Sequence, residues 1–260
     1  MKPIFHILPL VAVLLSPAAT LAKSAQHHQM TSAASPSAAI AAAIAQPTRA
    51  EANRKQDVDR LPAAVLAFAG IRPGETVADF QAGGGYYTEM LASLVGPRGK
   101  VIALEAAEYF KPELWKPISD AHPNVSLVTP SLVQLKLGPN TVNTIFTHLV
   151  FHDLYLGTTR SGAAIPLPSD ILANWFAAVK RGGHVIVADH VGPAGDATEV
   201  AKRLHRIDPA KVKADMAKAG FVLQSESHVL QRNDDSHQLL VFDKTLRGHT
   251  DRFLLKFRRP

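Results

Sequence analysis

Residues 77–88 read Val-Ala-Asp-Phe-Gln-Ala-Gly-Gly-Gly-Tyr-Tyr-Thr, an apolar run that ends in a turn of three consecutive glycines. A helical pattern follows over 86–95, and a second apolar run, 100–104, ends in Glu105, twenty residues beyond Gly85. Strand, glycine turn, helix, strand and terminal acid form the first half of a nucleotide-binding βαβ unit. Glycines let the backbone approach a ligand closely, and an acid at the end of the next strand can bind both hydroxyls of a ribose. The stretch therefore predicts an adenosine-containing cofactor.

The position of the last glycine separates two kinds of adenosine cofactor. A dinucleotide loop reads G-x-G-x-x-G, and its last glycine lets the helix N-terminus close on a pyrophosphate. Thr88 stands at that position here. S-adenosylmethionine has no phosphate, and the common loop of its methyltransferases, D-x-G-x-G-x-G, matches Asp79 to Gly85 except for Gln81 at the first glycine. The pattern favours S-adenosylmethionine, with a nicotinamide cofactor and a bare tight turn as the alternatives.

The N-terminus is typical of an exported protein. Residues 1–22 predict a cleavable signal peptide, because Lys2 supplies a positive start, 4–15 an apolar core and Thr20-Leu21-Ala22 a small-x-small cleavage site. A periplasmic or secreted protein without a membrane span in its mature form is expected. The alternative is a short N-terminal membrane anchor.

The composition limits the kinds of partner and site. The chain has no cysteine, which excludes disulfides, thiolate metal sites and cysteine nucleophiles. Its formal net charge of +6 is spread along the chain without a nucleic-acid motif, so nucleic acid is not an expected partner. Residues 23–50 are rich in Ala, Ser, Gln, His and Pro and are predicted to be a disordered leader. Residues 51–260 are predicted to form one folded domain.

Within this domain, short apolar strands alternate with amphipathic helices. Strands are expected over 77–79, 100–104, 125–128, 143–151, 184–190, 221–227 and 252–258, and helices over 59–70, 86–95, 108–121, 170–179 and 209–219. The alternation predicts an α/β fold with a doubly wound, Rossmann-like, mostly parallel seven-stranded sheet that carries helices on both faces. Because the last two strands have no helix between them, an antiparallel hairpin is expected at one edge.

Several motifs together resemble the class I S-adenosylmethionine-dependent methyltransferases, and among them a bacterial group of often exported methyltransferase-like proteins. They include Arg60-Leu-Pro-Ala-Ala-Val-Leu-Ala-Phe-Ala-Gly, Gly83-Gly-Gly-Tyr-Tyr-Thr, His152-Asp-Leu, Ala188-Asp-His, Leu204-His-Arg-Ile-Asp-Pro and Thr250-Asp-Arg-Phe-Leu-Leu-Lys-Phe. The resemblance runs from about residue 50 to residue 260. It implies a methyltransferase that acts on a small-molecule acceptor.

The resemblance also implies a place for the cofactor. Gly83, Gly84 and Gly85, with Gln81 beside them, would hold its methionine end. Asp79 would orient the cofactor's amino group, and Glu105 would hold its ribose. Gln81 departs from the family's glycine and would reshape the methionine pocket.

Three polar groups follow strands on the edge where such sheets bind ligands. They are His152-Asp153, Asp189-His190 and His205-Arg206-Ile207-Asp208. A base is needed when the acceptor is a hydroxyl or a protonated amine, and histidine suits this role near neutral pH. We predict His152 or His190 as the base, with Asp153 or Asp189 orienting it. The alternative for Asp189 and for 205–208 is that they fix loops by hydrogen bonds.

Clusters of histidine and aspartate also raise the question of a metal. In catechol-type methyltransferases, carboxylates and amide oxygens hold the metal, and their spacing is not reproduced here, so no metal ligand is predicted.

A competing functional hypothesis is an exported binding or envelope-associated protein that keeps the fold without turnover. Gln81 and the signal segment favour this hypothesis. The intact set of Gly83, Gly85 and Glu105 favours the enzyme.

Overall fold

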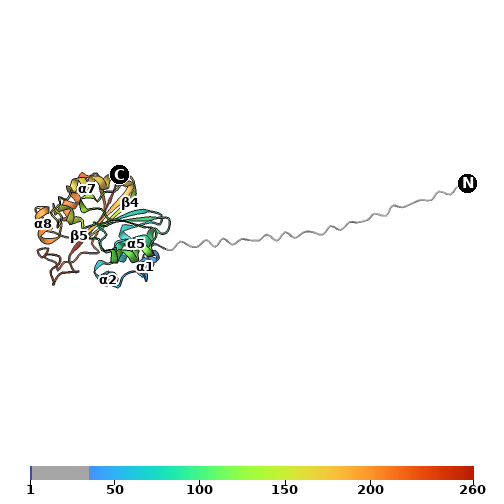
Figure 1. Ribbon diagram of the computed structural model, residues 1–260, viewed down its shortest axis with the longest axis horizontal. Coiled ribbons are helices and arrows are strands. Elements are labelled where there is room, and N and C mark those ends of the chain that lie inside the picture. The colour runs from blue at the N-terminus through green and yellow to red at the C-terminus, as the bar shows by residue number, and fades with distance from the viewer. Residues whose placement is uncertain (2–34) are drawn as a thin grey trace. The chain divides into compact units, whose positions relative to one another are not determined.

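The computed structural model describes Met1 and residues 35–260 (Figure 1). The predicted signal segment, Met1 apart, and residues 23–34 of the predicted leader lie outside the described residues. No described helix combines the length and the apolar character that crossing a membrane requires.

A seven-stranded sheet in the order β3-β2-β1-β4-β5-β7-β6 forms the centre of the domain. The strands are β1 Thr76–Phe80, β2 Lys100–Leu104, β3 Val125–Val128, β4 Val142–His148, β5 Val179–His190, β6 Val222–Ser227 and β7 Arg252–Arg258. The first five strands pair in parallel, whereas β7 runs antiparallel to both β5 and β6. The predicted α/β fold class, with its antiparallel edge, is confirmed.

Helices cover both faces of this sheet. They are α1 Pro36–Ile44, α2 Glu51–Arg54, α3 Asp57–Arg60, α4 Pro62–Ala69, α5 Tyr86–Val95, α6 Pro112–Ala121, α7 Pro168–Ala178, α8 Ala197–Leu204 and α9 Pro209–Lys218, with 3-10 helices η1 Leu132–Gln134 and η2 Phe151–Tyr155. Side chains of a strand alternate between faces. Ala78 and Phe80 of β1 therefore pack in one core with α7 and α9, and Val77 packs in another with α1, α4 and α5.

The loop after β4 differs from the predicted strand over 143–151. The strand ends at His148, Leu149 takes a positive φ of 63°, and η2 follows. Phe151 is fully buried, and its ring lies 5.9 Å from that of Trp175 on α7. Phe151 thus packs into the core beneath a helix instead of extending the strand, whereas Leu149 and Val150 are half-buried. This turn carries His152 to the edge of the sheet.

Helix α1 lies in the range that the sequence predicts to be disordered. Ser35 caps it by accepting a hydrogen bond from the backbone of Ala38. Ile40 and Ala43 are buried against α4 and α5. The described part of the predicted leader is therefore folded, because a small apolar stripe suffices for a helix that only covers part of an existing core.

We predict that Ala43→Glu lowers the free energy of unfolding by about 1–3 kcal/mol, because it places a charged group in the core beneath α1. Ala43 is fully buried, whereas Ala42, its neighbour on the same helix, is exposed. Ala42→Glu is the matched control and should change stability by less than about 0.5 kcal/mol. Urea denaturation measures both; equal stability of the two variants would contradict the packing of α1.

Candidate active site

The chain passes from β1 to α5 through the glycine turn, residues 81–85. Gln81, Gly83 and Gly85 have positive φ angles of 52°, 59° and 73°. Gln81 thus holds a conformation that costs an ordinary residue about 1–2 kcal/mol. A Cβ atom on Gly83 would meet no protein atom within 4 Å, so the backbone here faces open space. A ligand can approach this backbone closely.

Glu105 directly follows β2 and reaches the glycine turn. The Gly83 N–H donates a hydrogen bond to Glu105 Oε2 at 2.6 Å. Glu105 is buried, and this burial raises the pKa of its carboxyl to about 7, because the charged form loses solvation. The other carboxylate oxygen keeps its capacity to accept hydrogen bonds from a ligand. The structure thus brings the predicted acid and the predicted turn together.

Asp79 is buried within β1 and serves the start of α5. Thr88 Oγ1 donates a hydrogen bond to Asp79 Oδ2 at 2.6 Å. Burial raises the pKa of Asp79 to about 6, although the bond from Thr88 opposes the shift. In the described part of the chain, Asp79 lines neither of the two cavities that the next paragraph describes. The threonine that breaks the dinucleotide pattern therefore holds the first acid of the motif.

Two cavities open on this edge of the sheet. The first, which we name the loop cavity, has a volume of about 480 Å³, and its wall includes Arg60, Gln81, Gly83, Gly84, Tyr86 and His148. The second, the histidine cavity, has a volume of about 730 Å³, and its wall includes Gly83, Glu105, His152, Asp153, His190 and His205. Arg60, Gln81 and Gly83 belong to both walls, so the two cavities adjoin at the glycine turn.

Arg60 and His148 are two cavity residues that the sequence analysis missed. The guanidinium of Arg60 lies 4.4 Å from the centre of the Tyr86 ring. The charges of Asp79 and Asp57 act on it from a distance, but no described carboxylate is close enough to form an ion pair with it. His148 ends β4, and both of its ring nitrogens are buried without a hydrogen-bond partner among the described residues. Burial holds the pKa of His148 well below its ordinary value, so the ring is neutral. The only sequence signal for Arg60 was its place at the start of the Arg60-Leu-Pro motif.

Asp189, the second-last residue of β5, orients His152. It is fully buried. Its carboxylate accepts a hydrogen bond from the His152 backbone N–H at 2.7 Å and lies 3.0 Å from His152 Nδ1. Burial alone would lower the pKa of His152, but the carboxylates of Asp189 and Asp153 outweigh it and raise the pKa above its ordinary value. With Nδ1 engaged, Nε2 is the nitrogen left for other partners.

His190 has a different partner. Its Nδ1 lies 2.6 Å from Thr250 Oγ1, and only its backbone N–H donates to Asp189. Burial and the charge of Arg252 hold the pKa of His190 well below its ordinary value. Of the two predicted bases, His152 is therefore the one whose ring is paired with a carboxylate.

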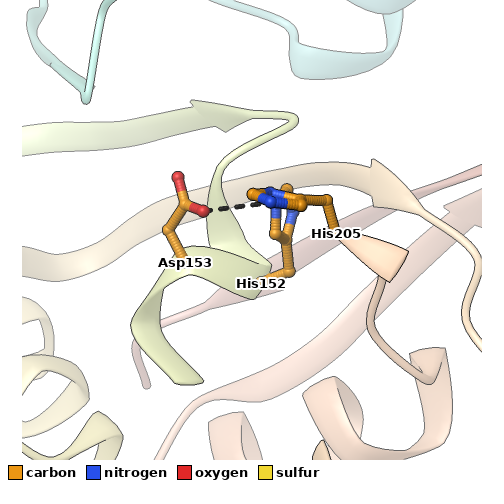
Figure 2. Close-up of side chains that lie close together, drawn as sticks. All are labelled: His152, Asp153 and His205. Atoms are coloured by element: carbon orange, nitrogen blue, oxygen red, sulfur yellow. Dashed lines mark hydrogen bonds and ion pairs between the residues drawn. The ribbon is translucent and has the colours of Figure 1, made fainter. Parts of the chain in front are cut away.

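Asp153 and His205 complete a group around the His152 ring. Figure 2 shows the three side chains turned toward one another. His152 Nε2 lies 3.2 Å from Asp153 Oδ1 and 3.3 Å from His205 Nδ1. His205 follows α8 and has a positive φ of 52°. The structure thus brings together residues of two predicted polar groups, 152–153 and 205–208. The third group supplies Asp189, which contacts the other nitrogen of the His152 ring.

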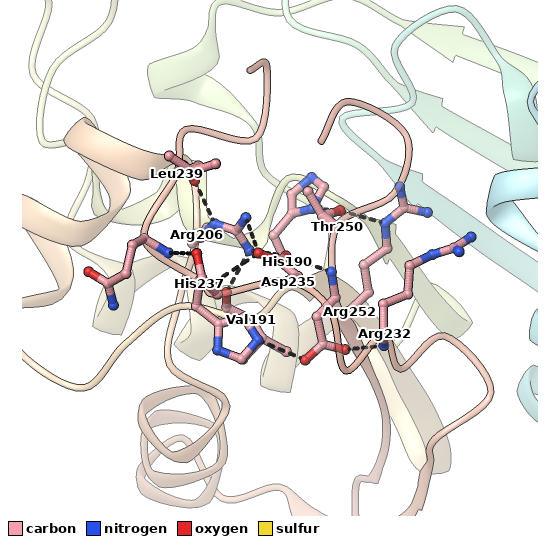
Figure 3. Close-up of polar contacts among 12 residues, drawn as sticks. His190, Val191, Arg206, Arg232, Asp235, His237, Leu239, Thr250 and Arg252 are labelled. Atoms are coloured by element: carbon pink, nitrogen blue, oxygen red, sulfur yellow. Dashed lines mark hydrogen bonds and ion pairs between the residues drawn. The ribbon is translucent and has the colours of Figure 1, made fainter. Parts of the chain in front are cut away.

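A buried ion pair fixes the segment between β6 and β7 beside this cavity (Figure 3). The Arg206 guanidinium donates to both carboxylate oxygens of Asp235, at 2.9 and 3.1 Å, and neither side chain is exposed. Asp235 also accepts a hydrogen bond from the Asp251 backbone N–H. The segment contributes Val241 and Phe242 to the wall of the histidine cavity. Arg206 therefore has the loop-fixing role that the sequence analysis kept as an alternative.

Comparison with known proteins begins with the sequence. No family model matches the chain. An arsenite methyltransferase of Halobacterium salinarum is 28% identical over 159 residues, which make up 60% of this chain and 36% of that protein. The chain thus spans about a third of the length of this curated relative.

Solved structures extend the likeness to most of the chain. An S-adenosylmethionine-dependent methyltransferase from Aquifex aeolicus has a TM-score of 0.55 at 20% identity and covers 76% of this chain and 88% of its own. A Burkholderia thailandensis 1,6-didemethyltoxoflavin-N1-methyltransferase, solved with bound 1,6-didemethyltoxoflavin and S-adenosylhomocysteine, has a TM-score of 0.52 at 16% identity, and the match covers 80% of this chain and 78% of that one. The chain has the fold of the class I S-adenosylmethionine-dependent methyltransferases.

We predict that Asp235→Ala lowers the free energy of unfolding by about 3–5 kcal/mol, because it leaves the buried Arg206 guanidinium without its counter-charge. Glu226→Ala is the control, since its ion pair with Lys213 is partly exposed on both sides and should contribute about 0–1 kcal/mol. Chemical denaturation compares the two variants. A loss at Asp235 no larger than the loss at Glu226 would contradict the role of the pair.

Proposed function

We propose that the protein is an S-adenosylmethionine-dependent methyltransferase that acts on a small-molecule acceptor. The observation that carries the proposal is the meeting of the glycine turn and the strand-end acid: Gly83 donates to Glu105 at 2.6 Å, and both residues face one cavity. The fold and the relatives support it, because both are those of methyltransferases. Fold alone does not name an acceptor, so the acceptors of the relatives are not transferred.

Residues in the walls of the two cavities fit two parts of the cofactor, its ribose and its amino-acid end. Glu105 would hold the ribose with its free carboxylate oxygen, and the open backbone at Gly83 leaves room beside it. Gln81 and Gly84 line the adjoining loop cavity. S-adenosylmethionine supplies a methyl group on a sulfonium, which an acceptor takes by in-line displacement, so the protein contributes mainly by positioning.

Arg60 and His148 would hold the amino-acid end of the cofactor. A carboxylate is the natural partner of a partly buried guanidinium that pairs with no described acid. The neutral His148 ring offers one donor and one acceptor to the same loop cavity. Asp79, which the sequence analysis assigned to the amino group, would act at a distance by holding α5 through Thr88.

The acceptor would bind in the histidine cavity, next to the shared wall. His152 is favoured over His190 as the residue that activates the acceptor. Asp189 contacts Nδ1 of the His152 ring and so orients it, and Nε2 then lies on the side of Asp153. His190 would shape the cavity wall with Thr250. The relatives give no support to the alternative of a binding protein without turnover, because they are methyltransferases. The proposal also includes export of the protein, which is inferred only from the signal-peptide pattern of residues 1–22.

The Glu105 carboxyl generates a prediction about pH. With a pKa of about 7 in the free protein, it is mostly charged at pH 8 and mostly neutral at pH 6. A neutral carboxyl accepts ribose hydrogen bonds less well, so the affinity for S-adenosylhomocysteine should fall about tenfold from pH 8 to pH 6. Glu105→Gln should bind more weakly at pH 8 and lose this dependence. Calorimetric titration measures both proteins, and an unchanged slope in the variant would contradict the assignment.

The Arg60 assignment generates a prediction about cofactor fragments. Arg60→Gln should weaken S-adenosylhomocysteine by about 10- to 150-fold, as expected for hydrogen bonds to a charged group. Methylthioadenosine lacks the amino-acid end, so its affinity should stay the same. Arg54→Gln, at an exposed position on α2, is the matched control. Equal losses for both ligands would show that Arg60 acts on the pocket as a whole instead of on a carboxylate.

A further inference from the structure

Three metal-binding side chains converge on one point of the histidine cavity. One donor atom each from His152, Asp153 and His205 can be chosen so that all of them lie within 4.8 Å of one another. Figure 2 shows that the donors come from two separate segments, η2 and the residue after α8. Sequence spacing alone does not bring them together, because His205 is 53 residues from His152.

Two of the three separations between the donor atoms match those of ligands on one metal ion. Two ligand atoms that each lie about 2.1 Å from a metal are about 3.0 Å apart at a right angle and about 3.4 Å apart at the tetrahedral angle. His152 Nε2 lies 3.2 Å from Asp153 Oδ1 and 3.3 Å from His205 Nδ1. The third pair, Asp153 and His205, lies within the 4.8 Å that spans the whole group, and the Asp153 side chain is 23% exposed.

Asp189 supplies the outer support that histidine ligands of metals have. It holds His152 Nδ1 at 3.0 Å, which directs the lone pair of Nε2 toward Asp153 and His205. Two carboxylates, Asp153 and Asp189, also match the charge of a divalent ion. Arg160 and Lys202 line the same cavity, and the charge of Arg160 acts on Asp153 and His205. In the described part of the chain, neither cation forms an ion pair with Asp153.

His205 ends α8 as its C-cap. Its φ of 52° is left-handed, and its backbone N–H donates to the carbonyl oxygen of Ala201. This cap fixes the backbone that carries the His205 ring. The His205 ring is held between His152, with ring centres 5.3 Å apart, and Phe242, at 5.1 Å.

We propose that His152, Asp153 and His205 bind one divalent transition-metal ion, with Asp189 as the outer partner of His152. Two imidazoles and one carboxylate suit ions such as Zn²⁺, Fe²⁺ or Co²⁺, whereas Mg²⁺ and Ca²⁺ prefer oxygen ligands. Three protein ligands beside a cavity leave a position open, which is typical of catalytic sites.

What the ion does rests on the proposed methyltransferase function. An acceptor hydroxyl in the open position would become more acidic and would lose its proton to solvent water. Its oxygen would then take the methyl group from the sulfonium and leave S-adenosylhomocysteine, so the ion would activate the acceptor in place of the free imidazole. One lone pair on Nε2 cannot serve both as a ligand and as a base, so the two modes are alternatives at one atom. The substrate class that follows is a small molecule with a hydroxyl group that can bind at the open position of the ion.

The test uses the full chain, purified without a histidine tag and freed of metal by a chelator. Co²⁺ is the probe, because its visible absorption reports imidazole and carboxylate ligation. We expect one Co²⁺ per chain. Asp153→Asn and His205→Asn should each lower its affinity at least tenfold, and Asp189→Asn should lower it 10- to 100-fold. Asparagine tolerates a positive φ, so His205→Asn should keep its fold, which circular dichroism checks.

His249→Gln is the matched control, because this histidine is 60% exposed and lies beside Asp59 instead of in the cavity. It should bind Co²⁺ like the unchanged protein. Spectra identical to free Co²⁺, or equal affinity in the folded Asp153→Asn and His205→Asn proteins, would overturn the metal site. S-adenosylhomocysteine binding, measured separately, distinguishes the two proposals. A protein that binds S-adenosylhomocysteine but not Co²⁺ refutes only the metal site. A protein that binds Co²⁺ but not S-adenosylhomocysteine refutes only the proposed function.

Discussion

The candidate site depends on one buried carboxylate, that of Asp189. It accepts hydrogen bonds from the backbone N–H groups of His152 and His190 and contacts the His152 ring. A fully buried carboxylate is costly unless several donors satisfy it, and here the donors come from the loop after β4 and from β5 itself. The same bonds that satisfy Asp189 therefore set the direction of His152 and join the ends of two neighbouring strands.

A second set of buried bonds closes the cavity from the side of β7. The ring of His190 contacts Thr250, whose hydroxyl accepts from the Arg252 side chain. Arg252 also donates to the backbone carbonyl of Asp59, next to Arg60. A chain of contacts thus runs from the end of β5 through β7 to the segment that carries Arg60. This arrangement explains how residues remote in sequence can form the walls of adjoining cavities.

The departures from the expected glycine loop have physical consequences in the structure. Gln81 keeps the positive φ that a glycine would take without cost, and its side chain lines both cavities. Thr88, at the position of the last dinucleotide glycine, bonds Asp79. Tyr86 binds Asp57, which also pairs with the buried Arg49, so the turn is tied to the N-terminal helices. The loop is thus supported by segments outside the βαβ unit.

Local patterns in the sequence determined most of the fold, including the glycine turn and the strand that Glu105 follows. Strand alternation, the glycine turn and the acid at 105 are short-range features, because strand, turn and helix each depend on residues close in sequence. The end of β4 was predicted three residues too far, since the apolar run Leu149–Phe151 reads the same whether a sheet or a helix covers it. Helix α8 was missed, and α1 was assigned to a disordered leader, because both are short and owe their burial to neighbouring elements.

Tertiary structure alone decided which polar groups meet. In the sequence, His152 is adjacent to Asp153 and Asp189 is adjacent to His190, whereas His205 lies apart. Nothing in this order indicates that Asp189 contacts the ring of His152 and not that of His190. Pairing of this kind depends on where parallel strands end side by side and on how the following turns point the side chains. The same holds for Arg60 and His148, which line one cavity only because the ends of α3 and β4 meet there. Residue types and local order are written in the chain, but the distances between remote side chains exist only after the sheet has assembled.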